Sequence, residues 1–214
     1  MDTPQEVASY SSMNHQVVSE AFVDRLIQLG AQGRMLDLGT GPGDFPFKVV
    51  SKIPNAHVHG IDLAHHMIAL AEKQKQKQSD AIAQKIKFSI MDVTDLQFQD
   101  NTFDCVFSNT ILHHLPDPRP MLTQALRVLK PQGVLLIRDL YRPSDPQSVE
   151  KILERHARQD TPQQRQLLAD SLHAAFEPGE LWQMLQELNI KNVQVVIDSD
   201  RHISLQRLAS NTQR

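Results

Sequence analysis

The sequence has few cysteines, no strong excess of charge and no long apolar run. Cys105 is the single cysteine among 214 residues, which excludes an internal disulfide and a cysteine-based zinc site. The net charge of −3 gives no general attraction to nucleic acid or to a membrane surface. No apolar run reaches the length of a membrane-spanning helix. We therefore expect no membrane span, and a nucleic-acid partner is disfavoured.

The first residues lack the basic start and apolar centre of a secretory signal peptide. We therefore expect a cytoplasmic protein. The length suffices for one α/β domain with a full core, and the chain shows no repeats or linker. We expect a single domain over residues 1–214. His57 and His59 share one face of a predicted strand, but no third ligand is evident, so we expect no metal site.

Three of the 8 glycines stand at alternate positions in one short segment. Gly39, Gly41 and Gly43 follow the apolar segment 35–38 and precede a segment that can form a helix. Glycines spaced in this way let the backbone turn sharply and approach a ligand closely. The N-terminus of the following helix offers unpaired N–H groups. The pattern predicts a strand, a ligand-binding turn and a helix.

Asp37 narrows the class of ligand, because it lies two residues before the first glycine. Its carboxylate would repel a pyrophosphate and attract a cationic ligand. The glycine spacing also differs from the G-x-G-x-x-G of dinucleotide-binding proteins. A nicotinamide dehydrogenase is therefore the weaker enzyme hypothesis.

Two further acids end predicted strands, where ligands collect in open α/β sheets. Asp62 ends the strand His57–Asp62, so it could accept hydrogen bonds from ribose hydroxyls or cap the helix expected over 64–78. Asp92 follows the strand expected over 86–91. Asp95 is the nearby competitor, and its simpler role is in a turn or cap.

These segments resemble the class I S-adenosylmethionine (SAM)-dependent methyltransferases of the type 11/25-like group. The resemblance extends over roughly residues 33–139. The Phe-Asp-x-Val motif at 103–106, Leu-His-His-Leu-x-Asp-Pro at 112–118 and Leu-Lys-Pro-x-Gly at 129–133 are similar to small-molecule methyltransferases, including the ubiquinone and menaquinone C-methyltransferase branch.

The resemblance implies a Rossmann-like α/β fold with helices on both faces of a mostly parallel seven-stranded sheet. The implied strand order is 3-2-1-4-5-7-6, with strand 7 antiparallel, and the segment 129–133 would be the turn into strand five. It also implies SAM as the cofactor. The acid and glycines would hold its methionine end, Asp62 its ribose and Asp92 its adenine. The implied cofactor residues are Asp37, Gly39, Thr40, Gly41, Gly43, Asp62, Leu63, Met67, Asp92, Val93, Asn109 and Thr110.

His113 and His114 are the candidate catalytic residues, because a histidine can accept a proton near neutral pH. The alternative is that one packs inside and the other caps a helix or faces the pocket, and sequence does not separate the two. Arg138 and Asp139, at the end of the fifth strand, could form an ion pair or contact substrate. Cys105 lies in mid-strand, which favours a place in the core.

Two segments lie outside the motif region. Residues 1–30 include a helix expected over 14–29, which either packs on the sheet or acts as a lid with Tyr10 and Met13 over the cofactor. Residues 140–189 are expected to form helices over 147–158, 162–175 and 178–188 that shape the substrate pocket. Its candidate lining residues are Tyr141, Arg142, His156, Arg165 and His173, and Trp182 is expected in the core.

The sequence thus predicts in-line methyl transfer from SAM to a small molecule. The Pro-Pro of nucleic-acid N-methyltransferases is missing after Asn109, which argues against methylation of DNA amino groups. The alternatives are a SAM-binding protein without transferase activity, acting as a sensor or partner subunit, and a methyltransferase on protein or RNA. The acceptor, the acceptor atom and the oligomeric state stay open.

Overall fold

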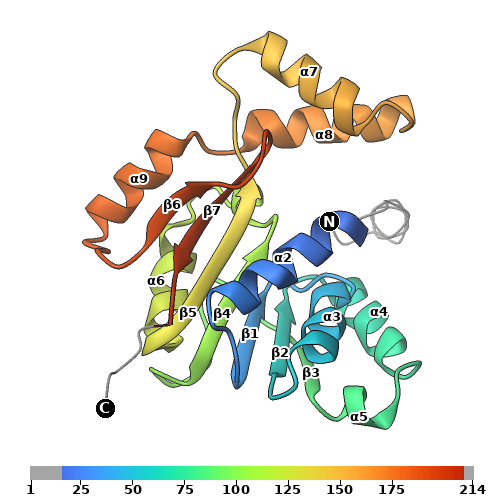
Figure 1. The fold of residues 1–214 in the computed structure, drawn as a ribbon, viewed down its shortest axis with the longest axis vertical. Helices are drawn as coiled ribbons and strands as arrows, with labels where there is room; N and C mark the ends of the chain where they lie inside the picture. The colour runs from blue at the N-terminus through green and yellow to red at the C-terminus, as the bar shows by residue number, and fades with distance from the viewer. Residues whose placement is uncertain (1–15, 210–214) are drawn as a thin grey trace. The chain divides into compact units, whose positions relative to one another are not determined.

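The computed structural model describes residues 16–209 and contains one seven-stranded sheet (Figure 1). The strand order is β3-β2-β1-β4-β5-β7-β6. The strands are β1 (Arg34–Leu38), β2 (His57–Asp62), β3 (Ile86–Ile90), β4 (Phe103–Asn109), β5 (Leu129–Leu140), β6 (Gln194–Ile197) and β7 (His202–Arg207). β1 pairs in parallel with β2 and β4, β2 pairs in parallel with β3, and β6 and β7 are antiparallel. The predicted order and the antiparallel seventh strand are confirmed.

The helices begin and end within a few residues of their expected bounds. They are α2 (Gln16–Gln28), α3 (Asp44–Lys52), α4 (His65–Lys75), α5 (Asp80–Ala83), α6 (Arg119–Val128), α7 (Pro146–His156), α8 (Pro162–Ala174) and α9 (Pro178–Glu187), with the 3₁₀ turn η1 (Leu112–His114). The short α5 is an addition to the sequence prediction. Tyr10 and Met13, the predicted lid residues, lie outside the described residues.

The chain divides into two compact units, which are described separately. Of the described residues, the first comprises 16–108, 120–136 and 207–209, and the second comprises 109–119 and 137–206. Strand β5 contributes residues to both units. The expectation of one domain over residues 1–214 stays a prediction.

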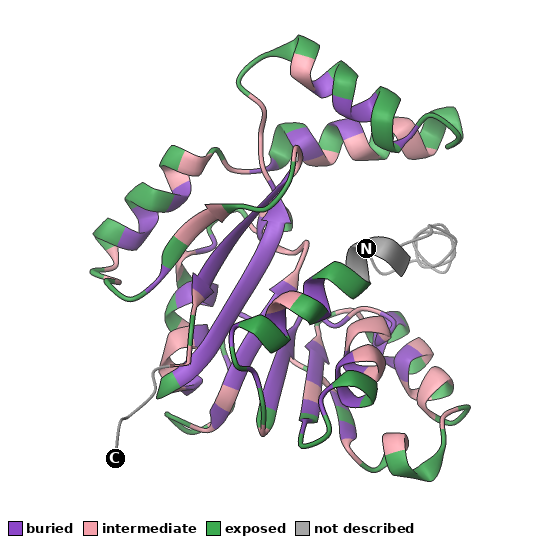
Figure 2. Ribbon diagram, viewed as in Figure 1, coloured by how far each residue is buried: buried purple, intermediate pink, exposed green. Residues whose placement is uncertain are grey.

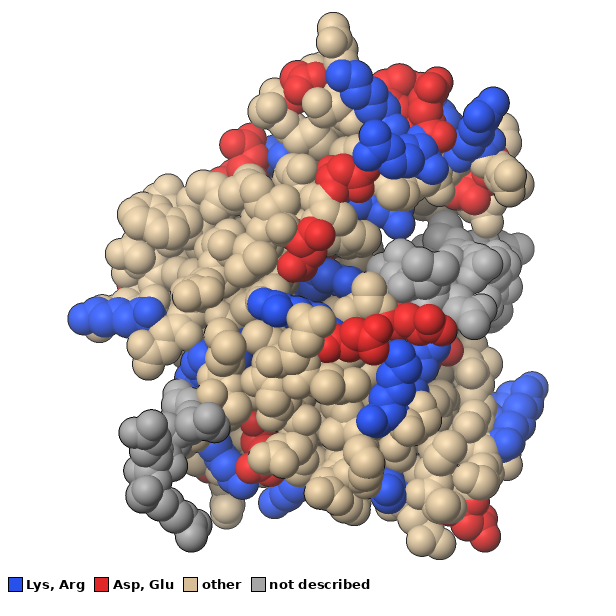
Figure 3. Space-filling model, in the orientation of Figure 1, with Lys and Arg blue, Asp and Glu red and all other residues tan. Residues whose placement is uncertain are grey.

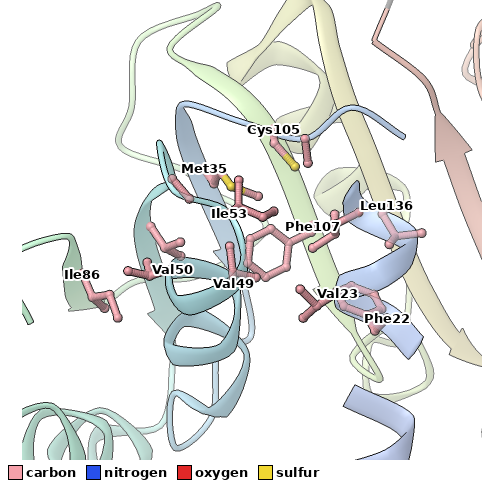
Figure 4. Packing of buried hydrophobic residues seen from close by; sticks show 14 of the residues in the cluster. Phe22, Val23, Met35, Val49, Val50, Ile53, Ile86, Cys105, Phe107 and Leu136 are labelled. Carbon is pink, nitrogen blue, oxygen red and sulfur yellow. The ribbon is translucent and has the colours of Figure 1, made fainter. Parts of the chain in front are cut away.

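One apolar cluster of the first unit lies on one face of the sheet, where β1, β4 and the first half of β5 contribute residues (Figure 4). Alternate strand residues point into it, because side chains of a strand alternate between the two faces of a sheet. Met35, Cys105, Phe107 and Leu136 supply this face, and α2 and α3 pack against it. Cys105 is fully buried, which agrees with its expected place in the core. Burial raises the pKa of its thiol.

Helix α2 has the inward face that its apolar spacing predicts. Phe22 and Leu26 are fully buried, and the Phe22 ring lies 4.9 Å from that of Phe45, measured between ring centroids. Gly30, with φ 84°, ends the helix, and the Ala31 N–H donates to the Leu26 carbonyl. Glycine suits this left-handed position, and the pattern is a Schellman cap.

The second unit has its own apolar cluster, in which α7, α8 and the end of β5 meet. The outward faces of these helices are exposed (Figure 2). An N-cap residue precedes each helix. The Asp145 carboxylate accepts from the Ser148 N–H at the start of α7, and Thr161 forms a capping box with Gln164 at the start of α8.

Two sequence predictions are wrong. Trp182 on α9 is 60% exposed, whereas Leu181 and Leu185 are buried. Leu181 and Leu185 are four positions apart and share the buried face of α9. Since successive helical residues point about 100° apart, Trp182 lies off this face and is exposed to solvent. The segment 129–133 is not a turn but the extended beginning of β5. The Arg207 guanidinium, which donates to the carbonyls of Lys130 and Gly133, holds it extended.

Candidate functional site

The glycine turn between β1 and α3 has the conformation that its spacing predicts. Gly39, Gly41 and Gly43 have φ values of 72°, 53° and 89°, a region that residues with a side chain rarely adopt. A Cβ on Gly43 would lie 2.8 Å from the Phe88 ring, so glycine is required there for space as well. The turn is closed by hydrogen bonds from the N–H groups of residues 39 and 40 to the Ile61 carbonyl.

Asp37 lies beneath this turn and is 2% exposed. Its carboxylate accepts a hydrogen bond of 2.8 Å from the Thr40 hydroxyl. Burial raises the pKa of Asp37 to about 7; the Thr40 hydrogen bond lowers it and the nearby Asp62 charge raises it further. The ionised form of Asp37 is therefore poorly stabilised in the protein alone, and a cationic ligand nearby would stabilise it.

Asp62 connects the end of β2 to the glycine turn. One carboxylate oxygen accepts from the Gly41 N–H at 2.9 Å, and the other accepts from the Ala64 N–H at 2.9 Å. Asp62 is not the N-cap of α4, because that position is Ala64. A carboxylate has about four acceptor positions, so acceptor capacity remains for ribose hydroxyls.

Asp92 and Asp95 both belong to the turn after β3, where the Asp95 N–H donates to the Asp92 carbonyl at 3.2 Å, so the simpler role expected for Asp95 is confirmed. The Asp92 Oδ1 accepts from both the N–H and the hydroxyl of Thr94, at 2.8 and 2.7 Å. No described residue donates to Oδ2. Leu63 is 65% exposed, whereas Val93 and Met67 are buried. The adenine role of Asp92 and Val93 stays a prediction.

The second unit contains the next predicted pair, Asn109 and Thr110. Thr110 has a φ of 59°, an outlier for a β-branched residue. Its N–H donates to the Arg138 carbonyl at 2.8 Å, and its hydroxyl donates to the Asn109 carbonyl at 2.7 Å. The Arg138 Nε donates to the Asn109 side-chain oxygen at 2.9 Å. These contacts hold a strained backbone in place, which is typical of a functional site.

His113 and Asp139 form a buried pair in the same unit. The Nδ1 of His113 lies 2.6 Å from Asp139 Oδ1, and the two side chains are 5% and 2% exposed. The His113 N–H donates to Asp139 Oδ2 at 3.2 Å, and the Leu140 N–H donates to Oδ1 at 2.6 Å. Because a carboxylate accepts hydrogen bonds, Nδ1 is the donor of this pair, and in the neutral ring Nε2 is then the nitrogen with the lone pair.

His114 has a different environment, although its ring centroid lies only 4.0 Å from that of His113. Burial, together with the neighbouring His113, lowers the pKa of His114 to about 4. At pH 7 it is therefore neutral and a weak base. The structure thus distinguishes the two histidines that sequence could not separate.

The predicted pocket residues of segment 140–189 do not all come together. Tyr141 and His156 both contact Asp200. Arg142 pairs with Glu177 and Glu180, Arg165 pairs with Glu150, and His173 is exposed. Asp200, in the turn between β6 and β7, is not among the residues that the sequence predicts for this pocket. Asp139 was a candidate, but its partnership with His113 was not anticipated.

The structure also bears on a metal site and a membrane-spanning helix, neither of which is expected from the sequence. Within residues 16–209, no group of three or more His, Cys, Asp or Glu side chains could hold a metal ion. In the same part of the chain, no helix is long and apolar enough to span a bilayer.

Comparison with known proteins assigns the family. A family model described as a methyltransferase domain matches residues 29–193. Phosphoethanolamine N-methyltransferase 2 of Caenorhabditis elegans is 39% identical over 103 residues, which is 48% of this chain and 23% of that protein. The ubiquinone/menaquinone biosynthesis C-methyltransferase UbiE of Roseobacter denitrificans is 30% identical over 132 residues, 62% of this chain and 52% of that one. The chain spans about half the length of these relatives or less.

A solved structure supports the fold over the whole chain. A SAM-dependent methyltransferase from Aquifex aeolicus superimposes with a TM-score of 0.71 at 19% identity, and the match covers 98% of this chain and 100% of that one. The glycine turn follows β1, and Asp37, Asp62 and Asp92 lie at or beside the ends of β1, β2 and β3; their roles toward a cofactor stay a prediction. This chain belongs to the class I SAM-dependent methyltransferases.

Proposed function

We propose that this protein transfers the methyl group of SAM to a small-molecule acceptor. The observation that carries the proposal is the hydrogen bond from the Gly41 N–H to the Asp62 carboxylate. It joins the glycine turn to the acid at the end of the next strand. A ligand with a cationic end and a ribose could therefore contact both elements at once.

The residues present fit the cofactor. Asp62 keeps acceptor positions for ribose hydroxyls, Asp92 keeps its Oδ2 for an adenine amino group, and the buried Asp37 would favour a nearby positive charge. SAM supplies an already activated methyl group when it is bound. The task of the chain is then orientation, which can contribute about 7–11 kcal/mol.

His113 is the residue that we assign as the base for an acceptor that starts protonated. Asp139 fixes the ring and its tautomer, so that Nε2 can take a proton from a hydroxyl or amine of the acceptor. His114 does not suit this role, because its pKa is lowered to about 4.

A small-molecule acceptor is supported by the net charge of −3 and by the missing Pro-Pro after Asn109. Relatives are named for methylation of phosphoethanolamine and in ubiquinone and menaquinone biosynthesis. These names indicate small-molecule acceptors, and we propose that class for this chain. We propose no particular acceptor within it.

Calorimetric titration of the full chain with SAM, S-adenosylhomocysteine and NAD tests the cofactor. We expect the two adenosyl ligands to bind and NAD not to bind. Asp62→Ala should weaken adenosyl binding about tenfold or more, since hydrogen bonds to a charged group contribute about 1.5–3 kcal/mol. The exposed Asp95→Ala is the matched control and should bind as the wild type does. Absence of adenosyl binding would reject the cofactor site.

Transfer of labelled methyl from SAM into a metabolite extract, an RNA fraction and a protein fraction tests the acceptor class. We expect label in the metabolite fraction alone. Label in RNA or protein would reject the small-molecule assignment, and adenosyl binding without any transfer would favour a binding protein without transferase activity.

A further inference from the structure

The second unit contains a cavity whose lining includes none of the candidate cofactor residues and neither His113 nor His114. Its volume is about 290 Å³, and it is lined by the loop after β5, by α7 and by the turn between β6 and β7. The lining combines charged and apolar side chains, namely Tyr141, Ser144, Lys151, Ile152, Arg155 and Asp200. This volume is close to the lower end of the usual range for small-molecule pockets, about 300–1,000 Å³.

Asp200 holds the wall of this cavity in place. Its carboxylate accepts from Arg155 Nη1 at 2.6 Å and lies 3.0 Å from His156 Nε2. Its backbone carbonyl accepts from the Tyr141 hydroxyl at 3.1 Å. Tyr141, Arg155 and Asp200 in the cavity wall therefore already have fixed partners, which reduces the entropy that these side chains lose when a ligand binds.

Two cations, Lys151 and Arg155, and one carboxylate, Asp200, line the cavity, and the Asp145 carboxylate is close enough to Lys151 to interact with its charge. Lys151 and Arg155 stand four positions apart on α7, so they share one helix face. Within residues 16–209, Lys151 has no ion-pair partner at 4.0 Å or less, and Arg155 uses one Nη1 donor on Asp200. Asp145, at the start of α7, is engaged by the N–H and hydroxyl of Ser148. Figure 3 shows Lys and Arg side chains gathered over α7, with acidic side chains among them.

We propose that this cavity binds the phosphate group of a small molecule. A phosphate carries nearly two negative charges near neutral pH, which matches the Lys151 ammonium and the remaining donors of the Arg155 guanidinium. The Ser144 hydroxyl lines the same cavity and can donate as well. Ile152, 5% exposed, gives an apolar floor against which a short organic group can pack. This site does not depend on the proposed methyl transfer.

Titration calorimetry of the full chain with inorganic phosphate, glycerol 3-phosphate and glycerol tests the proposal. We expect saturable binding of the two phosphates and none of glycerol. Lys151→Met should weaken phosphate binding about tenfold or more, because it removes a charge-assisted hydrogen bond, and Lys151→Arg should restore most of the affinity. Lys191→Met, which removes an exposed cation outside the cavity, should bind as the wild type does.

Tighter binding of glycerol 3-phosphate than of inorganic phosphate would identify a phosphomonoester as the ligand class, whereas the reverse would identify free phosphate. Equal phosphate affinity in the wild type and Lys151→Met, or no binding at all, would overturn the proposal. Lys151 is exposed, so its variants should melt at the wild-type temperature, and circular dichroism checks that the fold is kept.

Discussion

The Nδ1 atom of His113 lies 2.6 Å from a carboxylate oxygen of Asp139, and both side chains are almost fully buried. His113 follows β4 and Asp139 is near the end of β5, two strands that are neighbours in the sheet. The ends of two neighbouring strands therefore create a histidine whose tautomer is fixed. Its Nε2 is the atom left to accept a proton.

His113→Gln should lower the rate of methyl transfer to a hydroxyl or amine acceptor by about 10²–10⁴-fold, because general-base catalysis contributes that much. Binding of S-adenosylhomocysteine should stay as in the wild type. His114→Gln is the matched control and should reduce the rate far less. Equal losses in the two variants would contradict the assignment of His113 as the base.

Asp139→Asn tests Asp139 as a positioning residue. The amide can donate as well as accept, so His113 is no longer held in one tautomer. We expect kcat to fall more than KM changes, and the pH profile of kcat to shift. A variant with lower stability but an unchanged pH profile would show that Asp139 is only structural.

Asp37 should make the free energy of unfolding fall as the pH rises from about 4 to about 7. Its pKa is raised in the folded protein from 3.8 to about 7, so the folded state binds the extra proton in this range. The whole difference amounts to about 4 kcal/mol at most. Urea unfolding of the wild type and Asp37→Asn between pH 4 and pH 8 measures it.

In that comparison the variant should gain stability relative to the wild type as the pH rises. His59, His114 and His202 have lowered pKa values and change stability with the opposite sign. They are present in both proteins, so their contribution cancels. A difference between the two proteins that does not vary with pH would show that Asp37 ionises normally.

Gly43→Ala should destabilise the protein by about 1–3 kcal/mol, because it strains a positive φ and brings a methyl group within 2.8 Å of the Phe88 ring. It should also weaken binding of S-adenosylhomocysteine. Gly179→Ala is the matched control, since nothing lies within 4 Å of its added Cβ. We expect that variant, in helix α9, to be neutral or up to about 1 kcal/mol more stable. Denaturant unfolding of the wild type and the two variants measures these changes in the free energy of unfolding.

Thr110→Gly should relieve the strain of a β-branched residue at φ 59°, which costs of order 1–3 kcal/mol. If this strain positions residues 109 and 110 for the cofactor, binding of S-adenosylhomocysteine should weaken while the fold is kept. Asn189→Gly is the control, because Asn189 also has a positive φ of 53° but follows α9. Equal affinities in both variants would remove Thr110 from the cofactor site.

The sequence alone predicted the first three strands and the glycine turn, because both depend on local patterns, whereas the strand order of the sheet followed from the family resemblance. Apolar runs beside Asp37, Asp62 and Asp92 predicted three strands, and the resemblance implied that they are parallel. The three glycines fixed the turn, since a positive φ at each of them favours glycine whatever surrounds it. Local spacing also placed the helices of residues 147–188 to within a few residues.

Tertiary structure alone decided how residues distant in the chain are paired. The choice between His113 and His114 depended on Asp139, which comes 26 positions later than His113 in the chain. The cavity beside α7 depended on Asp200, which follows Arg155 by 45 positions. Trp182 was misplaced because its exposure depends on which stripe of α9 is buried. Long-range contacts of this kind leave no periodic pattern in the sequence, because the fold and not the spacing brings the side chains together.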